Sequence, residues 1–217
     1  MIKACIFDLD GTLCDTLTTI AYFGNEALKH FGLDEIAVEE YKYMIGNGYK
    51  NLITKMLKYL GVYTDELFQK VADYYFEIYD KNPLYLTKPY EGILEMLNAL
   101  SEKGIKTAVL SNKPHNATLN VAKEILTDIN FSHVQGNIEG IPLKPKPDAL
   151  LNIIDILGVE KDECLYIGDT ATDIETGKNA GVKTVGVLWG FRTEKELKDA
   201  GADWIASSAD EIVEYIR

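Results

Sequence analysis

Three features of the sequence predict an α/β protein with a Rossmann-like parallel-sheet core and an α-helical cap domain inserted after the first strand. A short apolar run, 2–7, ends in a polar turn. The segment 15–85 then carries only helical patterns, without a strand pattern between them. From Tyr90 onward, short apolar runs alternate with helical patterns of about ten residues, which is typical of right-handed crossovers in a parallel sheet.

The first strand leads directly into two closely spaced carboxylates. The apolar run from Ile2 to Phe7 is followed by Asp8, Leu9, Asp10 and Gly11. Acids at i and i+2 leave a strand on the same side and repel each other unless a cation lies between them or one holds a proton. A glycine turn can also expose N–H groups to an anion. Such a site suits a Mg²⁺-bound phosphoryl group, although Asp and Gly are also ordinary residues of a turn.

The helical insertion is defined by apolar stripes at helical spacing. The first stripe is closed by Gly32, and Pro83 and Pro89 bracket the exit of the insertion. We therefore expect a cap domain at 15–85 and a core domain formed by 1–14 and 86–217. The cap helices are expected at 15–31, 36–45, 49–60 and 65–79.

The second part of the chain is expected to build the rest of the sheet, with ligands at the carboxyl ends of its strands. The pattern predicts strands at 106–110, 131–134, 164–167, 183–187 and 203–205. It predicts helices at 91–103, 114–126, 148–157, 170–180, 193–200 and 209–216.

Composition limits the classes of partner. The chain has 217 residues and a net charge of -12, so nucleic acid and anionic membranes are unsuitable partners. Arg192 and Arg217 are the only arginines, so anions must be recognised by lysines, hydroxyls, backbone amides or metal. Three cysteines without C-x-x-C spacing, and no signal or membrane-spanning pattern, favour a reduced cytoplasmic protein, monomeric or homodimeric.

Polar residues follow the strand expected at 106–110. Ser111 and Asn112 could hydrogen-bond a phosphate oxygen beside a helix N-terminus, although either could simply cap that helix. Further on, prolines at alternate positions stiffen the segment Leu143-Lys144-Pro145-Lys146-Pro147 and would hold a lysine in place. A fixed ammonium there would neutralise phosphate charge, whereas the alternative is a solvated basic loop.

Two more carboxylates follow the strand expected at 164–167. Asp169 stands at the strand end and Asp173 one helical turn later, so both can face one cavity. With Asp8 and the Asp10 carbonyl, Asp169 would complete an oxygen shell for Mg²⁺, and Asp173 would serve as an outer or water-mediated ligand. A preference for acids at a helix start explains only one of this pair.

Taken together, these motifs resemble the four motifs of the haloacid dehalogenase-like hydrolase superfamily, in the same order. The matching residues are Asp8 to Thr12, Ser111, Lys144, and Gly168-Asp169 with Asp173. The resemblance implies that Asp8 is a nucleophile and Asp10 a general acid/base, with catalytic roles for Ser111 and Lys144. It also implies that Lys144, rather than Lys146, is the lysine of the site. The insertion would correspond to an α-helical cap.

Other stretches resemble the phosphoglycolate phosphatase branch. They are Ile45-Gly46-Asn47-Gly48, Leu188 to Arg192 and Ala200 to Asp203, although the two cap glycines could be a bare helix break. The implied function is Mg²⁺-dependent hydrolysis of a small phosphate monoester through an aspartyl phosphate. Alternatives are a phosphomutase, a pyrophosphatase or nucleotidase, and a non-catalytic phosphate-binding module. The expected phosphate- or substrate-binding residues are Gly11, Thr12, Ser111, Asn112, Lys144, Asn47 and Lys50.

Overall fold

A computed structural model describes residues 1–82 and 84–216; Pro83, expected near the exit of the insertion, and Arg217 lie outside the described residues. The main strands are β1 (Ala4–Phe7), β4 (Lys106–Pro114), β5 (His133–Asn137), β6 (Cys164–Gly168), β7 (Lys183–Val187) and β8 (Trp204–Ala206). They form one sheet in the order β5-β4-β1-β6-β7-β8, and all neighbouring strands are parallel. The predicted Rossmann-like parallel sheet is thus confirmed.

The first strand lies in the middle of this sheet, between β4 and β6. Phe7, its last residue, pairs with Val109 on one side and Ile167 on the other. The chain crosses first to one side of β1 and later to the other, so the order of the strands reverses there. In an open parallel sheet, ligands bind at the carboxyl ends of the strands at this reversal. The residues that follow β1 are therefore placed where a site is expected.

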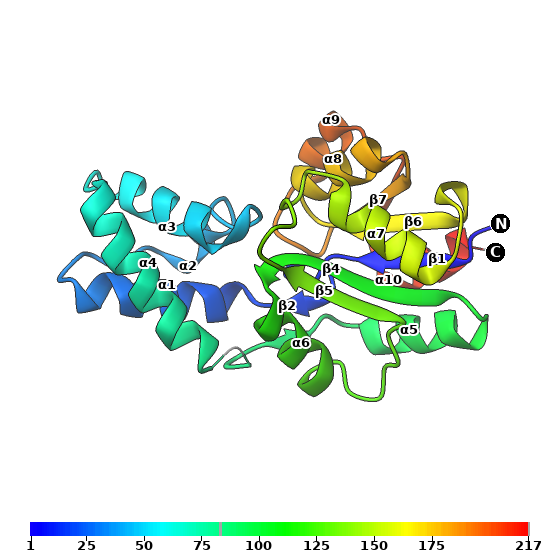
Figure 1. The fold of residues 1–217 in the computed structure, drawn as a ribbon, viewed down its shortest axis with the longest axis horizontal. Coiled ribbons are helices and arrows are strands. Elements are labelled where there is room, and N and C mark those ends of the chain that lie inside the picture. Colours follow the sequence, from blue (N-terminus) through cyan, green and yellow to red (C-terminus); the bar gives the residue numbers. More distant parts are fainter. Residues whose placement is uncertain (83, 217) are drawn as a thin grey trace.

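Helices cover both faces of the sheet, and alternate residues of β1 explain how. Cys5 and Phe7 pack in a cluster with α5 (Ile93–Glu102), α6 (His115–Glu124) and α10 (Ala209–Tyr215). Ala4 and Ile6 point to the other face, where α7 (Asp148–Leu157) and α8 (Ala171–Ala180) pack. Figure 1 shows these layers, with α9 (Glu194–Ala200) beside α8 and both termini at the end of the core away from the first four helices.

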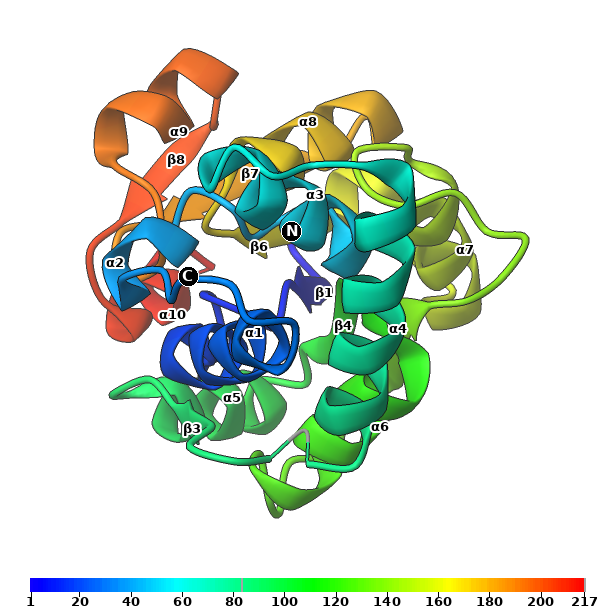
Figure 2. The same cartoon turned by 90° about the vertical axis from the view of Figure 1, so that its left-hand side faces the viewer.

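The first four helices form a separate lobe over the carboxyl ends of the strands (Figures 1 and 2). They are α1 (Leu17–His30), α2 (Val38–Tyr41), α3 (Gly48–Tyr59) and α4 (Asp65–Asp80). These helices bury an apolar cluster of their own. That cluster supports the cap domain that we propose for 15–85. Among the described residues, no helix combines the length and the apolar character needed to cross a membrane.

Three local features differ from the sequence-based expectation. The strand expected to end at Leu110 continues to Pro114, so Ser111 and Asn112 lie within β4 rather than cap a helix. The helix expected at 36–45 covers only Val38–Tyr41. A two-stranded antiparallel pair, β2 (Cys14–Asp15) with β3 (Lys88–Pro89), closes the junction of the lobe with the core. Two-residue strands show no alternation, so the sequence pattern could not reveal this pair.

Candidate active site

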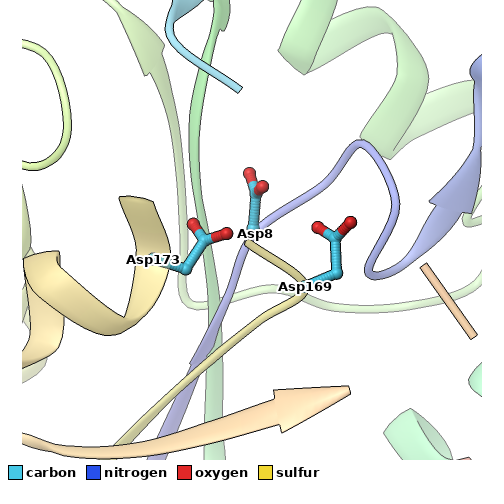
Figure 3. Close-up of side chains that lie close together, drawn as sticks. All are labelled: Asp8, Asp169 and Asp173. Carbon is cyan, nitrogen blue, oxygen red and sulfur yellow. The ribbon is translucent and has the colours of Figure 1, made fainter. Parts of the chain in front are cut away.

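Three buried carboxylates meet where β1 and β6 end. Asp8 follows β1 directly, Asp169 follows β6, and Asp173 lies in the first turn of α8. Figure 3 shows the three side chains gathered from these elements, and one oxygen atom of each lies within 4.8 Å of those of the other two. The three carboxylates are thus close together, although Asp8 lines the cavity described below and Asp169 and Asp173, which were expected to face one cavity, lie behind it.

Hydrogen bonds fix the orientation of Asp169 and Asp173. Thr12 Oγ1 donates to Asp169 Oδ1 over 3.2 Å, and the Phe191 N–H donates to Asp169 Oδ2 over 2.8 Å. Asp173 Oδ2 accepts from both the N–H and the hydroxyl of Thr170 in a capping box. Both carboxylates are thus held in place before any ligand binds.

The glycine after the two acids is required by close packing. Gly11 has φ of 87°, and a Cβ built on it would lie 2.3 Å from Asp169 Oδ2. Its N–H donates to the Cys14 carbonyl, and Thr12 is bound to Asp169. Gly11 therefore packs closely against Asp169, and Thr12 donates a hydrogen bond to it. Neither residue lines the cavity described below. Direct phosphate contacts from these two residues, which the sequence suggested, find no support in this geometry.

Lys144 links two of the carboxylates. Its Nζ lies 2.8 Å from Asp8 Oδ1 and 2.7 Å from Asp173 Oδ1, and the side chain is 2% exposed. Asn112 holds the Lys144 backbone, because its Oδ1 accepts from the Lys144 N–H and its Nδ2 donates to the Lys144 carbonyl. Lys146, the other lysine of the same loop, is exposed. The stiff proline loop thus buries Lys144 against the acids.

A second buried ion pair was not anticipated from the sequence. Lys113 Nζ donates to Asp10 Oδ1 over 2.8 Å, and the two side chains are only 3% and 13% exposed. In an extended strand, Ser111 and Lys113 point to the same side, so a longer β4 would have placed Lys113 at the site. The pair was missed because the strand was expected to end at Leu110.

The charges at this end of the sheet do not balance. The four carboxylates Asp8, Asp10, Asp169 and Asp173 face two ammonium groups, Lys113 and Lys144, which leaves two negative charges in excess when all are ionised. Burial, together with the charge of Asp173, raises the pKa of Asp8 to about 7 even though Lys144 opposes the shift. Burial and the neighbouring acids likewise raise the pKa of Asp169 well above its ordinary value.

A cavity of about 60 Å³ lies between this charged floor and the helical lobe. Polar groups of the core form one side, including Asp8, Asp10 and Ser111. The lobe provides a largely apolar side. Its lining residues are Ile20, Ile45, Gly46, Gly48, Tyr49, Leu52, Tyr75, Phe76 and Tyr79.

Hydrogen bonds join the lobe to the core around this cavity. Asn112 Nδ2 donates to the Gly46 carbonyl over 3.0 Å, and Thr172 Oγ1 donates to Asn47 Oδ1 over 3.0 Å. Arg192, from the loop after β7, donates to the carbonyls of Lys42 and Ile45. Neither Asn47 nor Lys50 lines the cavity, although both were expected to contact substrate. Asn47 instead joins the lobe to α8.

The parallel sheet, the acid-bearing strand ends and the helical lobe define a Rossmann-like α/β protein with an inserted helical lobe, and comparisons with known proteins agree. The family model described as haloacid dehalogenase-like hydrolase matches residues 5–187. The chain belongs to this family, as the sequence motifs predicted.

Several relatives within this family share a name. The chain is 38% identical to a phosphoglycolate phosphatase of Aquifex aeolicus, over 87% of this chain and 86% of the relative. It is 32% identical to a phosphoglycolate phosphatase of Haemophilus influenzae, over 92% and 91% of the two chains. A crystal structure from Lactobacillus delbrueckii subsp. bulgaricus, provisionally named a phosphoglycolate phosphatase, superimposes with a TM-score of 0.94 at 32% identity and covers 99% of this chain and 98% of its own.

Proposed function

We propose that this protein is a Mg²⁺-dependent phosphatase that hydrolyses a small phosphate monoester of the phosphoglycolate type through an aspartyl phosphate on Asp8. The observation that carries this proposal is the position of Asp8, at the end of the central strand, on the floor of the cavity between core and lobe and beside Lys144. The names of the relatives support the substrate class. Three buried free cysteines support the cytoplasm as the compartment.

Four residues would carry out the steps of this reaction. Asp8 attacks the phosphorus atom, and Asp10, two residues along the same turn, donates a proton to the leaving oxygen. Asp10 then takes a proton from the water that cleaves the aspartyl phosphate. Lys144 and the Ser111 hydroxyl, both lining the cavity, stabilise the charge on the transferring oxygens. The lobe excludes bulk water from the intermediate.

The residues present fit a divalent cation. Asp8, Asp169 and Asp173 each offer a buried carboxylate oxygen, and these three atoms lie within 4.8 Å of one another. Carboxylate oxygens are the ligands that Mg²⁺ prefers, and one divalent cation would balance the two excess negative charges. Asp8, Asp169, Asp173 and the Asp10 carbonyl would hold it, and the ion would supply charge neutralisation for the phosphoryl group.

The proposal is tested by phosphate release from a panel of esters with Mg²⁺ and with EDTA. The panel contains phosphoglycolate, a hexose phosphate, a nucleoside monophosphate and pyrophosphate. We expect metal-dependent release that is fastest with phosphoglycolate. Conversion of one hexose phosphate isomer into another would indicate a phosphomutase. A folded protein that releases phosphate from no ester would point to a non-catalytic phosphate-binding module.

The raised pKa of Asp8 predicts how metal-free protein responds to pH. A carboxyl whose pKa rises from 3.8 to about 7 on folding binds protons more tightly in the folded state, so its contribution to stability is complete below the unfolded pKa and is lost as pH rises through about 7. In EDTA, the melting temperature should therefore fall between about pH 5 and pH 8. Mg²⁺ should raise it most at the higher pH, because protons compete with the ion.

The matched control for this prediction is Asp8→Asn, which removes the titrating group. Thermal unfolding of this variant in EDTA should depend less on pH than that of the natural protein. An equal pH dependence in the two proteins would assign the effect to other groups and contradict the prediction.

A further inference from the structure

Recognition of an anionic leaving group requires a cation beside the phosphoryl site, and the described cavity lining offers two. Lys144 is already shared between Asp8 and Asp173. Among the acids that the structure describes, Lys113 is paired with Asp10. An ammonium group has three N–H donors; for Lys113 Nζ, Asp10 uses one and the neighbouring Tyr79 oxygen can use a second, which leaves the third. Lys113 can therefore bind a second carboxylate without releasing Asp10.

A second observation at the same place involves Tyr79 of α4. This residue lines the cavity and is 4% exposed, and its buried hydroxyl lies beside the Lys113 ammonium, for which its oxygen is an acceptor. The Lys113 Nζ lies 4.9 Å from the centroid of its ring. The hydroxyl proton has no acceptor among the described residues, and leaving it unbonded in a buried place is costly, so a ligand oxygen at this position would stabilise the site.

Both groups keep the protons that such a ligand needs. Burial raises the pKa of Tyr79, so the phenol stays neutral and can donate. Burial alone would lower the pKa of Lys113, but Asp10 and Tyr79 together outweigh it and the pKa is raised. A cationic donor and a neutral donor therefore stand together at the junction of lobe and core.

The position of Lys113 beside Asp10 limits the length of the leaving group. Asp10 donates to the leaving oxygen in the proposed reaction, and Lys113 is bonded to Asp10. In a phosphorylated 2-hydroxy acid, one carbon separates the leaving oxygen from the carboxylate, so the carboxylate must lie beside Asp10. The remaining lobe residues around the cavity, such as Leu52 and Phe76, are apolar or aromatic and offer no charge to an anion.

We propose that Lys113 and Tyr79 bind the carboxylate of a short 2-hydroxy acid leaving group, and that this pair sets the substrate specificity of the site. The proposal rests on the function proposed above. It assigns selectivity to one lysine of the core and one tyrosine of the lobe. A substrate carboxylate that binds both would therefore also hold the lobe against the core.

The test compares phosphoglycolate with 2-hydroxyethyl phosphate, an ester of similar size in which a neutral hydroxymethyl group replaces the carboxylate. The quantity measured is kcat/KM for phosphoglycolate divided by kcat/KM for 2-hydroxyethyl phosphate. It is compared between the natural protein and the variants Lys113→Met, Lys113→Arg and Tyr79→Phe. We expect Lys113→Met to lower this ratio by about 10- to 100-fold, because a hydrogen bond between charged groups is lost. Tyr79→Phe should lower it about 5-fold, and Lys113→Arg should retain most of it.

Tyr75→Phe is the matched control. Tyr75 lines the same cavity and stacks on Tyr79 with ring centroids 5.4 Å apart, yet is given no role in binding the carboxylate. Its substitution should leave the ratio unchanged. An equal fall with both esters in Lys113→Met would mean that Lys113 only positions Asp10, and would overturn the proposal. An unchanged ratio in Tyr79→Phe would remove Tyr79 from it.

Binding to Asp8→Asn separates this inference from the proposed function. This variant lacks the nucleophile, so affinity for the two esters can be measured by calorimetry without turnover. Tighter binding of phosphoglycolate that is lost when Lys113→Met is added supports the carboxylate site, even if the natural protein hydrolyses neither ester. Equal affinity for the two esters overturns it.

Discussion

Replacing Asp8 with asparagine should abolish turnover and leave the fold intact. The amide has almost the same shape but is a far weaker nucleophile, and loss of a nucleophile costs at least about 10³-fold in kcat. Asp8 stands between Asp173 and Asp169 with its pKa raised by burial, so removing its charge relieves repulsion. The metal-free variant should therefore unfold at the same temperature as the natural protein or higher.

Two measurements check this expectation. Steady-state phosphate release with Mg²⁺ gives kcat, and acid quenching during turnover of a radiolabelled ester detects phosphate attached to the protein. The label should appear on the natural protein and be absent from Asp8→Asn. Asp162→Asn makes the same chemical change at an exposed residue far along the chain and should keep full activity. Substantial turnover or labelling of Asp8→Asn would exclude Asp8 as the nucleophile.

The sheet and the acidic strand ends could be predicted because their signals are local. Buried parallel strands appear as short apolar runs, and a doubly wound topology brings their carboxyl ends together. Asp8 and Asp169 are far apart in the sequence, but each follows such a run directly. Their proximity follows from strand order, so no knowledge of side-chain packing was needed.

The parts of the site that could not be predicted depend on contacts between distant segments. Lys113 reaches Asp10 because β4 continues past Leu110, where pairing of Pro114 with Asn137 extends the strand. Tyr79 lines the cavity because the lobe folds back over the core, and a tyrosine in a helical stripe resembles any packing residue. Asn47 and Lys50 were expected at the substrate because the cap was expected to close over it, and the sequence does not show which cap residues then face the cavity.

Replacing Lys144 with methionine should reduce both stability and activity. The side chain has a similar length but no charge, and Asp8 and Asp173 would lose the cation that they share. Breaking a buried ion pair from one side typically costs about 3–5 kcal/mol. Loss of a fixed charge at the transferring phosphoryl group should also lower kcat by about 10²- to 10³-fold.

The stability deficit of Lys144→Met should depend on pH and on metal. Asp8, whose pKa is already raised, can take up a proton when the ammonium is lost, so urea unfolding in EDTA should show a smaller deficit at about pH 5 than at about pH 8. Mg²⁺ should restore part of the loss at the higher pH, because a cation held by the same carboxylates replaces the missing charge. Lys146→Met, at the exposed lysine two residues later, should change neither property. Uncompensated buried charge is strongly destabilising. If Lys144→Met were as stable as the natural protein at about pH 8 in EDTA, the Lys144 ammonium would not be compensating these carboxylates.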